Sequence, residues 1–358
     1  MSLNHAPPPV PRLAALATAT PPFDLAQEAV ARRAGAIFAA ESSGVQRPSP
    51  IYRNARIEHR QACVPLEWFD ETHGFAERNG LFLEHATALL SEAAGRALAE
   101  AGLGADEIDT IVTVCSSGIA TPGLDARVME TLGFRRDVQR LPVFGLGCAG
   151  GVIGLARAAA MARAAPDSHV LLLVVELCSL TFRRQDHSKS NMVATALFGD
   201  GAAAAVITCR TDTVSPAAPR LGPWGEHTWP GSLDVMGWEV ADDGLKVVFS
   251  RDIPTLVRDD LRPVVDAFMA RHKLRLADID EYVCHPGGAK VVDALEDCFD
   301  LDRGALGHAR DTLRDHGNMS AATVLFVLRA SLDAGGGGRR LMTTLGPGFT
   351  AAMLVIDA

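Results

Sequence analysis

The chain has 358 residues, of which 48% are hydrophobic and 22% charged, a composition typical of a globular protein rather than a disordered or collagen-like one. Its formal net charge of -9 provides no general positive field, which argues against nucleic acid or an anionic membrane surface as a partner. No apolar run approaches the roughly 20 residues that span a bilayer, so we expect no integral membrane association.

The N-terminus and the cysteines indicate a cytoplasmic protein. Met1 to Pro22 contains several prolines and one arginine, with no basic stretch followed by an apolar core, so it does not resemble a secretory signal. The seven cysteines are scattered and form no C-x-x-C, which argues against a disulfide framework or a zinc site. We expect most of them to be packing residues and one or two to take part in chemistry.

Runs of β-branched residues alternate with alanine-rich stretches along most of the chain, the pattern of an α/β protein. In chain order, we expect a helix over Glu84–Leu103, a strand over Thr110–Cys115, a helix over Gly151–Ala165, and strands over His169–Leu177 and Ala202–Cys209. The segment Thr211–Gly237 is rich in Pro, Gly and Trp and is expected to be a long surface connection.

Two parts of the chain resemble each other, which indicates a duplication. Ile108–Val112 resembles Ile279–Val283, each leading from a short acidic turn into a strand. Phe198-Gly199-Asp200-Gly201 resembles Leu345-Gly346-Pro347-Gly348 in the same way, and between these landmarks both copies contain a glycine-led turn that opens an alanine-rich helix. We therefore expect two copies of one βα layout.

Cys148 follows the stretch Leu141–Gly147 and precedes Ala149-Gly150-Gly151 and a helical pattern. A strand, a turn and a helix in this order place the thiol at a helix N-terminus, where free N–H groups and the helix dipole favour the thiolate and lower its pKa. Small neighbours leave room for a substrate. For a cysteine taken alone, a packing role in a tight turn is the better interpretation.

Two polar residues of the second copy occupy comparable positions. His285 ends the strand Tyr282–Cys284, and Asn318 opens the helix that corresponds to the Cys148 helix. If the copies pack about a pseudo-twofold axis, the two helix N-termini converge. Cys, His and Asn together allow thioester chemistry, because imidazole can pair with a thiolate, and imidazole and carboxamide N–H groups can stabilise an enolate or oxyanion.

Cysteine proteases use the same three residue types, and the 137-residue separation of Cys148 and His285 falls in their range. The papain-like C-G-[SA]-C-[WY] signature is absent, and Asn318 opens a helix. A His-Pro-Gly-Gly loop or a Gly-Asn cap taken alone would be structural. The local context therefore favours thioester chemistry over proteolysis.

Several motifs in one order resemble those of the type III polyketide synthases, the chalcone synthase-like members of the thiolase superfamily. The resemblance extends from about Tyr52 to the C-terminus and rests on Phe144–Gly151 (FGLGCAGG), Ala196–Ala202 (ALFGDGA), Val283–Gly288 (VCHPGG), His316–Ser320 (HGNMS) and Leu345–Thr350 (LGPGFT). It implies a thiolase-like α/β fold with duplicated βα halves in a layered αβαβα core. Residues 1–210 would form the half that carries the nucleophile, and residues 211–358 the half that carries the catalytic His and Asn.

The resemblance also implies roles for these residues. Cys148 would carry the primer acyl group and the growing chain as a thioester. His285 and Asn318 would polarise the thioester carbonyl of malonyl-CoA, promote decarboxylation and stabilise the enolate, and His285 would keep Cys148 as the thiolate. The substrate-binding residues implied are Phe198, an aromatic gatekeeper between the CoA tunnel and the cavity, Ser320, and the cyclisation-pocket loop of Gly346, Pro347 and Gly348.

Arg53, Arg56 and Arg60 match the spacing of the family's basic residues that bind the phosphates of CoA. A helical spacing of three and four places them on one face, where they would supply a local anion site; an ordinary solvated basic face has the same spacing. No metal ion or bound cofactor is implied, because there is no clustered ligand set and no G-x-G-x-x-G after a strand. Acyl-CoA and malonyl-CoA are expected as substrates, and the resemblance implies a homodimer.

Three positions depart from the chalcone synthases. Val247 stands where those enzymes carry a second aromatic gatekeeper, Cys178 where their cavity usually has Thr, and Thr121 where plant enzymes carry a Met from the partner subunit. The segment Ser116–Pro122 resembles bacterial synthases that take fatty acyl primers. We therefore expect iterative condensation of malonyl-CoA onto a fatty acyl-CoA primer, followed by closure to an alkylpyrone or an alkylresorcinol.

Three other functions fit the same residues less well. A β-ketoacyl-acyl carrier protein synthase of the initiating type shares the fold and the Cys, His, Asn set, and would need a basic surface for its acidic carrier protein. A Cys-His-Asn hydrolase would release a free acid without forming a carbon–carbon bond. A non-enzymatic interaction protein on the same fold would have no use for all three catalytic residue types.

Overall fold

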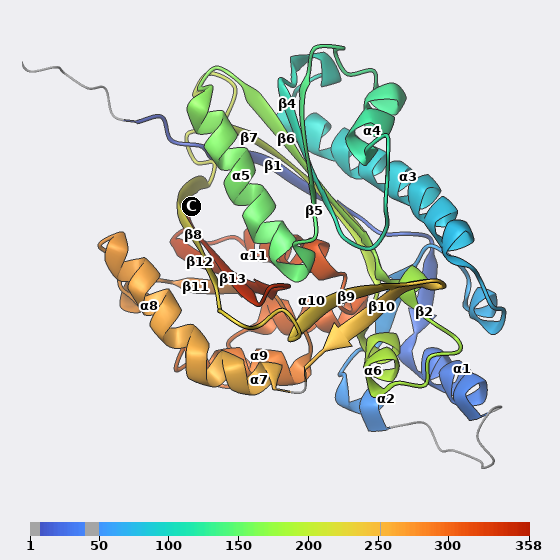
Figure 1. Ribbon diagram of the computed structural model, residues 1–358. Coiled ribbons are helices and arrows are strands. Elements are labelled where there is room, and N and C mark those ends of the chain that lie inside the picture. The colour runs from blue at the N-terminus through green and yellow to red at the C-terminus, as the bar shows by residue number, and fades with distance from the viewer. Residues whose placement is uncertain (1–7, 40–49, 251) are drawn as a thin grey trace, which may run out of the picture.

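The computed structural model describes residues 8–39, 50–250 and 252–358 (Figure 1). The strands are β1 (Arg12–Ala19), β2 (Phe23–Ala26), β3 (His59–Ala62), β4 (Thr110–Cys115), β5 (Gln139–Phe144), β6 (His169–Leu177), β7 (Asp200–Thr208), β8 (Arg220–Thr228), β9 (Met236–Ala241), β10 (Gly244–Phe249), β11 (Glu281–Cys284), β12 (Arg339–Gly346) and β13 (Thr350–Asp357). The α-helices are α1 (Gln27–Ala39), α2 (Pro50–Asn54), α3 (Phe75–Ala101), α4 (Leu124–Leu132), α5 (Gly150–Ala164), α6 (Lys189–Leu197), α7 (Ile253–Leu256), α8 (Arg262–Arg271), α9 (Ala289–Cys298), α10 (Gly307–His316) and α11 (Thr323–Asp333). The short 3-10 turns are η1 (Leu66–Asp70), η2 (Ala105–Glu107), η3 (Gly147–Ala149), η4 (Cys178–Thr181), η6 (Leu276–Asp278) and η7 (Ser320–Ala322), and a π-helical turn, η5 (Val257–Leu261), joins α7 to α8.

The main sheet contains the same strand arrangement twice. Its order over the described residues is β11-β12-β13-β8-β1-β7-β6-β4-β5. In the N-terminal copy, β1 pairs antiparallel with β7, β7 antiparallel with β6, and β6 parallel with β4. In the C-terminal copy, β8, β13, β12 and β11 repeat this order and these orientations. The two copies meet where β1 pairs with β8, so the duplicated α/β fold expected from the sequence is confirmed.

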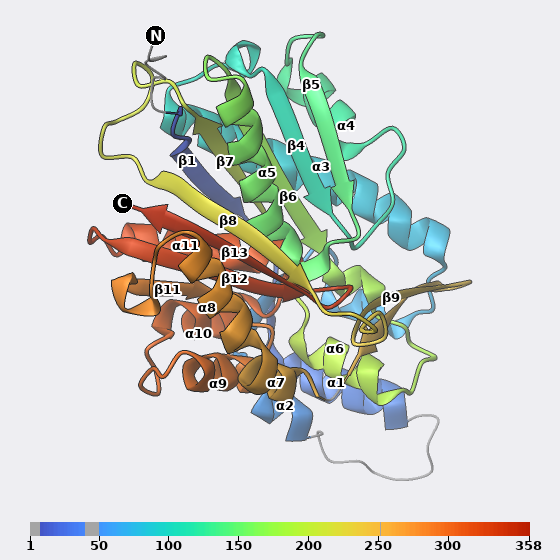
Figure 2. The ribbon, with the colours of Figure 1, turned by 60° about the vertical axis from the view of Figure 1, so that its left-hand side comes forward.

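Helices α5 and α11 form the central layer between the two copies (Figure 2). Side chains alternate between the two faces of a strand, and along β6 Leu172 joins the core around α5 whereas Leu173 joins the cluster beneath α3. Burial on both faces explains why β6 is apolar without interruption from Val170 to Val175. With α3 and α4 outside one copy and α8, α9 and α10 outside the other, the layers follow the expected αβαβα order.

Several elements have the bounds expected from the sequence. The strands over Thr110–Cys115 and His169–Leu177 are confirmed as β4 and β6, and the helix after Cys148 is α5. The helix expected from Glu84 starts nine residues earlier, at Phe75, and ends before Gly102, which adopts the left-handed conformation (φ 69°) that commonly stops a helix.

The expected surface connection over Thr211–Gly237 is wrong for its middle part. Residues 220–228 form β8, which lies in the interior of the main sheet beside β13. The proline and glycines that hid this strand have structural roles: the β8–β13 register shifts between Leu354 and Ile356, opposite Pro223, and a bulge is where a sheet tolerates a proline. A Cβ atom on Gly225 would lie 2.7 Å from the ring of Phe268.

The remaining global features concern membranes, metals and thiols. None of the helices in the described part of the chain combines the length and apolar character needed to cross a membrane. Over the same residues, no three His, Cys, Asp or Glu side chains gather in a way that could hold a metal ion. All seven cysteines are unpaired.

Candidate active site

A cavity of about 410 Å³ lies where the two copies of the fold meet, and the three sequence-predicted catalytic residues Cys148, His285 and Asn318 all line it. Most of the other lining side chains are apolar and come from α2, α6, β9, β10, α7, α9 and β12; they include Ile51, Val193, Leu197, Met236, Phe249, Ile253, Val291, Leu295 and Leu345. An apolar cavity with a few polar groups is the usual form of a small-molecule site.

Cys148 lies in η3, immediately before α5, and is 8% exposed. Its Sγ lies 3.7 Å from Oγ of Ser320, a residue of η7 at the start of α11. The starts of α5 and α11 approach so closely that a Cβ atom on Gly151 would lie 2.3 Å from the carbonyl oxygen of Ala321. The expected convergence of the two helix N-termini is therefore confirmed.

His285 follows β11 directly, and its backbone N–H donates to the carbonyl of Thr343 on β12. The side chain is 5% exposed, and neither ring nitrogen has a hydrogen-bond partner among the described residues. Burial lowers the pKa of His285 to about 4, so the ring is neutral at physiological pH and carries one N–H donor. Because an unpartnered buried polar group is destabilising, this ring is best explained by a ligand that it binds during function.

Asn318 is held by its backbone and by both ends of its amide. It pairs with Phe198 in an isolated parallel bridge, in which the Asn318 N–H donates to Leu197. Its Oδ1 accepts from the Ser320 N–H at 2.8 Å, and its Nδ2 donates to the carbonyl of Gly287 at 3.2 Å. This orientation leaves one Nδ2 hydrogen for a substrate oxygen.

The ionisation of Cys148 depends on its surroundings. Its pKa is raised to about 12, mainly by burial and to a smaller extent by Glu176, while the Ser320 hydroxyl and Asn318 act to lower it. The lowering expected from the helix N-terminus is therefore outweighed by burial. Since an isolated charge is costly in a buried site, whereas an ion pair is less so, a thiolate here requires a nearby cation, and His285 is the titratable base that shares the cavity.

The turn Gly346-Pro347-Gly348 packs against the nucleophile. A Cβ atom on Gly346 would lie 2.6 Å from both the Ala149 nitrogen and the Leu146 carbonyl oxygen, and one on Gly147 would lie 2.6 Å from Pro347. The residues of this segment that line the cavity are the preceding Thr343, Thr344 and Leu345. The turn therefore packs against the backbone on both sides of Cys148 and holds this residue in position.

Phe198, Val247 and Cys178 lie together beside the cavity. All three are buried in one apolar cluster with Ala194, and the Phe198 ring packs at 5.7 Å from that of Phe249. Phe249 lines the catalytic cavity, whereas Phe198 and Cys178 line a second pocket behind α6. An aromatic side chain thus stands on the cavity wall two residues after Val247.

Thr121 does not line the cavity of its own chain. It is exposed, in a segment with a cis Thr121–Pro122 peptide bond between β4 and α4.

The helical face expected for Arg53, Arg56 and Arg60 does not form. Helix α2 ends at Asn54, Arg56 has a φ of 56°, and Arg60 lies on β3. Arg60 is 3% exposed, and its Nη atoms donate to Gln27 and to the carbonyls of Thr195, Ala196 and Phe198. Its guanidinium thus holds the end of α6 in place and is not free for a phosphate.

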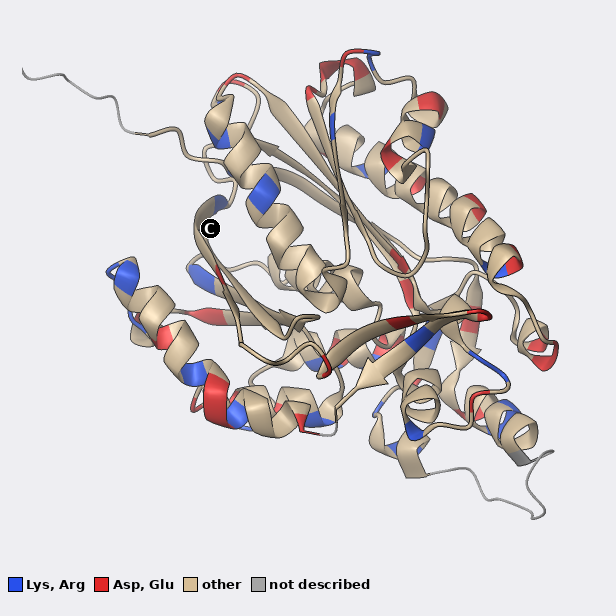
Figure 3. Ribbon diagram, in the orientation of Figure 1, with Lys and Arg blue, Asp and Glu red and all other residues tan. Residues whose placement is uncertain are grey.

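Arg53 and Arg56 border a different hollow. They line an open groove of about 1330 Å³ together with Arg310 and Arg314. Acidic residues lie beside them, since Asp293 is 3.8 Å from Arg56 and Asp311 pairs with Arg314. Figure 3 likewise shows basic and acidic residues interspersed on the outer helices.

Sequence reasoning missed two lysines. Lys189 at the start of α6 and Lys290 at the start of α9 line the catalytic cavity, and both are exposed. Neither forms an ion pair with a described residue. A signal was present in the sequence for Lys290, which stands two residues after the His-Pro-Gly-Gly motif. Lys189 is more than 90 residues away, and only folding brings the two together.

Comparison with known proteins identifies the family. The model of the chalcone and stilbene synthase N-terminal domain matches residues 69–211, and that of the C-terminal domain matches residues 226–358. A putative chalcone synthase of Bacillus subtilis (strain 168) is 38% identical over 354 residues, 96% of this chain and 97% of that protein. The 1,3,6,8-tetrahydroxynaphthalene synthase of Streptomyces peucetius subsp. caesius is 37% identical over 96% of this chain and 92% of its own length.

The fold gives the same result. The crystal structure of 1,3,6,8-tetrahydroxynaphthalene synthase from Streptomyces coelicolor A3(2), a bacterial type III polyketide synthase, superposes with a TM-score of 0.89 at 28% identity, covering 97% of this chain and 99% of that one. These matches favour a condensing enzyme over the hydrolase and the non-enzymatic alternatives. The chain belongs to the chalcone and stilbene synthase family and is a type III polyketide synthase, an acyltransferase that forms carbon–carbon bonds by Claisen condensation.

Proposed function

We propose that this enzyme condenses malonyl-CoA iteratively onto a fatty acyl primer held on Cys148 and closes the product to an alkylpyrone or alkylresorcinol. The observation that carries the proposal is the cavity itself, in which Cys148, His285 and Asn318 meet beneath a largely apolar wall. The polar groups supply the condensation chemistry, and the apolar wall suits an alkyl chain.

Loading begins when Cys148 transfers its proton to His285 and attacks the primer thioester. The carbon–sulfur bond to CoA breaks, the acyl group remains on Cys148, and CoA leaves as a thiol after it takes up the proton from His285. The transfer from thiol to imidazole keeps the pair neutral overall, which matters in a site where burial opposes an isolated charge on either residue.

Extension uses the neutral form of His285. Loss of CO₂ from malonyl-CoA leaves an electron pair on the enolate oxygen, to which the His285 N–H and the free Nδ2 hydrogen of Asn318 donate. The enolate carbon attacks the Cys148 thioester, the new carbon–carbon bond forms, and the thiolate of Cys148 leaves. The fixed amide of Asn318 has its donor in place before charge develops, which is where such a group is most effective.

We further propose that Lys189 and Lys290 hold the phosphates of CoA. Among the cavity-lining residues that the structure describes, they are the two lysines, and each stands in the first turn of its helix, where backbone N–H groups add to the attraction for anions. These lysines replace the three arginines first considered for this role. Lys189→Ala and Lys290→Ala should raise the KM for malonyl-CoA and leave kcat little changed; malonyl-pantetheine, which lacks the nucleotide phosphates, provides the control substrate.

A second product class is favoured by the relatives. The Streptomyces peucetius protein, 37% identical, is named a 1,3,6,8-tetrahydroxynaphthalene synthase, so this enzyme is a candidate for building a naphthalene product from malonyl-CoA alone. Incubation with malonyl-CoA, with and without acyl-CoA primers of graded length, separates the two. Products whose mass increases with the primer and that contain a pyrone or resorcinol ring support the proposal; a single primer-independent naphthalene product contradicts it.

We also propose a homodimer joined at the edge of the N-terminal copy. Edge strand β5 has a largely exposed surface, with Phe144 57% exposed, and Ile119 in the neighbouring loop is 45% exposed. Large apolar side chains at a sheet edge are typical of a subunit interface, and Thr121 lies in the same exposed loop as Ile119. Light scattering should give a molar mass of twice that of the 358-residue chain. Phe144→Glu should lower this mass to that of a single chain. A monomeric wild type would refute the proposed dimer.

A further inference from the structure

The catalytic cavity contains a second buried polar residue without a hydrogen-bond partner, Thr344 on β12. Thr344 is 2% exposed, and its Oγ1 has no partner among the described residues. Of the buried side-chain atoms in that part of the chain that lack a partner, those belonging to the cavity lining are this hydroxyl and the two ring nitrogens of His285. A buried hydroxyl without a partner is destabilising, so its place in the cavity calls for a functional explanation.

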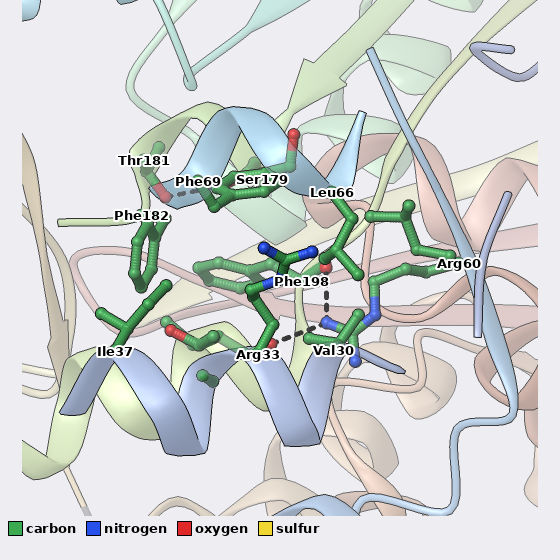
Figure 4. A pocket seen from close by; sticks show the side chains of 15 residues that line it. Val30, Arg33, Ile37, Arg60, Leu66, Phe69, Ser179, Thr181, Phe182 and Phe198 are labelled. Carbon is green, nitrogen blue, oxygen red and sulfur yellow. Dashed lines mark hydrogen bonds between the residues drawn. The ribbon is translucent and has the colours of Figure 1, made fainter. Parts of the chain in front are cut away.

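Unpartnered atoms outside the cavity include some that belong to groups engaged through their other atoms. Arg60 borders the pocket shown in Figure 4, and only its Nε lacks a partner, because its Nη atoms donate to Gln27 and to backbone carbonyls near the end of α6. Asp125 likewise has one oxygen 3.2 Å from Arg140 and one without a partner. Thr344 differs from both, because its single side-chain polar atom makes no hydrogen bond and is free to bind a group in the cavity.

Strand pairing places Thr344 beside His285. Strands β11 and β12 are parallel, with Cys284 opposite Thr343, and the N–H of His285 continues this ladder by donating to the carbonyl of Thr343 at 2.9 Å. The next pair in the same register is His285 and Thr344. Paired residues of neighbouring strands project from one face of a sheet, with backbones about 4.8 Å apart, so the hydroxyl and the imidazole are neighbours on the cavity wall.

The surroundings of the ring indicate which nitrogen is nearer to Thr344. A Cβ atom on Gly287 would lie 3.8 Å from Cδ2 of His285, and the carbonyl of Gly287 accepts from the amide of Asn318. Because Cδ2 is bonded to Nε2, the Nε2 edge of the ring lies toward Gly287 and Asn318. Nδ1 is on the opposite edge, close to the backbone of His285 and within reach of the adjacent strand.

We propose that Thr344 is a positioning residue that acts through His285: its hydroxyl donates to Nδ1 and keeps the proton of the neutral ring on Nε2. Threonine has staggered χ1 positions, and the proposed bond uses the one in which Oγ1 faces the ring. The hydrogen bond at one ring nitrogen sets which nitrogen carries the proton, so Nε2–H is directed, together with the Asn318 amide, at the enolate oxygen.

The inference rests on the proposed role of His285 and deepens it, since it assigns the group that sets the tautomer of the ring. The same hydroxyl also serves the charged ring that forms when Cys148 gives up its proton. Both ring nitrogens then carry hydrogen, and Oγ1 of Thr344 accepts from Nδ1–H, because a hydroxyl is both a donor and an acceptor.

The test removes the hydroxyl without changing the shape of the side chain. Thr344→Val replaces the hydroxyl with a methyl group, and Thr344→Ser retains it. Thr113→Val is the matched control, because Thr113 on β4 is 3% exposed, has a hydroxyl without a partner and lies outside the catalytic cavity. All variants are made in a Cys148→Ala background, where no thiol exchanges a proton with the ring. The readout is kcat and KM for decarboxylation of malonyl-CoA to acetyl-CoA.

We expect Thr344→Val to lower kcat about two- to tenfold, the effect of losing one hydrogen bond, and to leave KM unchanged because the hydroxyl does not touch the substrate. Thr344→Ser should restore kcat, and Thr113→Val should match the Cys148→Ala parent. An unchanged kcat in Thr344→Val, or an equal decrease in Thr344→Ser or in Thr113→Val, overturns the proposal. Should Thr344→Val fail to fold, Thr344→Ala replaces it in the comparison with Thr344→Ser, and equal rates of these two overturn the proposal.

A double-variant cycle shows whether the hydroxyl acts through the imidazole. His285→Gln retains an N–H donor in a side chain that has no tautomers to select. Adding Thr344→Val to His285→Gln should therefore leave kcat unchanged, since residues that act as a unit are not additive. A further decrease of the size seen with histidine present would show that the hydroxyl acts elsewhere, and it would overturn the proposal.

The two proposals fail separately. Decarboxylation that is unchanged by His285→Ala contradicts the proposed role of His285, and the inference about Thr344 falls with it. Decarboxylation that depends on His285 and is indifferent to the Thr344 hydroxyl retains the role of His285 and overturns the inference alone.

Discussion

The residues that follow equivalent strands in the two copies of the fold differ in their hydrogen bonding. In the N-terminal copy, β4 leads into Ser116, whose N–H and hydroxyl both donate to the buried carboxyl group of Glu176. In the C-terminal copy, β11 leads into His285, whose ring nitrogens have no partner among the described residues. We call the end of β4 closed, because its polar groups are hydrogen-bonded, and the end of β11 open, because the ring nitrogens of His285 are unpartnered.

The same contrast holds at the helix starts of the central layer. In the proposed mechanism, Cys148 before α5 is the nucleophile, whereas the Asn318 amide and the Ser320 hydroxyl before α11 are hydrogen-bond donors. On that proposal, a single βα layout provides attack from one copy and charge stabilisation from the other. At the site itself, both ring nitrogens of His285 lack a hydrogen-bond partner among the described residues, which is expected if stability is traded for function there.

The largest effect is expected from removing the nucleophile. Cys148→Ala leaves no group to carry the acyl chain, so condensation should fall by at least about 10³-fold. Intact mass spectrometry with acyl-CoA should show no acyl-enzyme. Acylation at another of the seven cysteines with retained product formation would contradict the assignment.

Removal of the donor in the other copy should be nearly as severe but different in kind. Asn318→Ala deletes one of the two donors to the enolate oxygen, and loss of one such donor lowers the rate by about 10²- to 10³-fold. Decarboxylation of malonyl-CoA should fall, whereas acylation of Cys148 by a primer should persist. Equal loss of both steps would show that Asn318 mainly positions η7.

The buried and unpartnered ring of His285 predicts a specific dependence of malonyl-CoA decarboxylation on pH. Burial lowers its pKa to about 4, so the neutral donor is present above that value and is lost as the pH falls through it. In a Cys148→Ala background, where no thiol exchanges a proton with the ring, decarboxylation of malonyl-CoA should remain nearly constant from about pH 8 to about pH 5. A Cys148→Ala/His285→Gln double variant controls for titration of the substrate, and a decline centred near 6.5 would contradict burial as the dominant influence.

Loss of the hydrogen bond at the end of β4 should lower the stability of the protein. Ser116→Ala removes the hydrogen bond of 2.7 Å to Glu176 and leaves a carboxyl oxygen that is 0% exposed at the residue level without that donor. The free energy of unfolding should fall by about 1–3 kcal/mol. His285→Ala removes no side-chain hydrogen bond and should leave the denaturant midpoint almost unchanged. Equal destabilisation by the two variants would contradict the difference in hydrogen bonding between the ends of β4 and β11.

The sequence predicted best those parts whose local pattern and tertiary environment agree. Strand β6 has its expected bounds because burial on both faces requires a continuous apolar run. Strand β8 was missed because Gly222, Pro223 and Gly225, which read as loop residues, are accommodated by a bulge and by the ring of Phe268.

The site shows the same division. Cys148, His285 and Asn318 each lie in a short motif, so the sequence singled them out and the structure places them in one cavity, whereas the lysines that line the same cavity come together only on folding. Lys189 and Lys290 come from different halves of the chain, and of the two only Lys290 stands near a motif. The arginine face failed because α2 stops at Asn54, after which Arg60 continues on a strand and turns inward.

The smallest effect is expected at the contact that joins the two copies. The Ser320 hydroxyl lowers the pKa of Cys148, because it can donate to the thiolate from 3.7 Å. Ser320→Ala should therefore raise that pKa and slow alkylation of Cys148 by iodoacetamide at neutral pH about two- to tenfold. Ser331→Ala is the matched control, since Ser331 is a buried serine of α11 that bonds Arg340 instead. Alkylation needs neither CoA nor malonyl-CoA, so its pH profile reports directly how the C-terminal copy affects the pKa of Cys148. Coincident profiles for wild type and Ser320→Ala would mean that this copy influences the nucleophile only through His285 and Asn318.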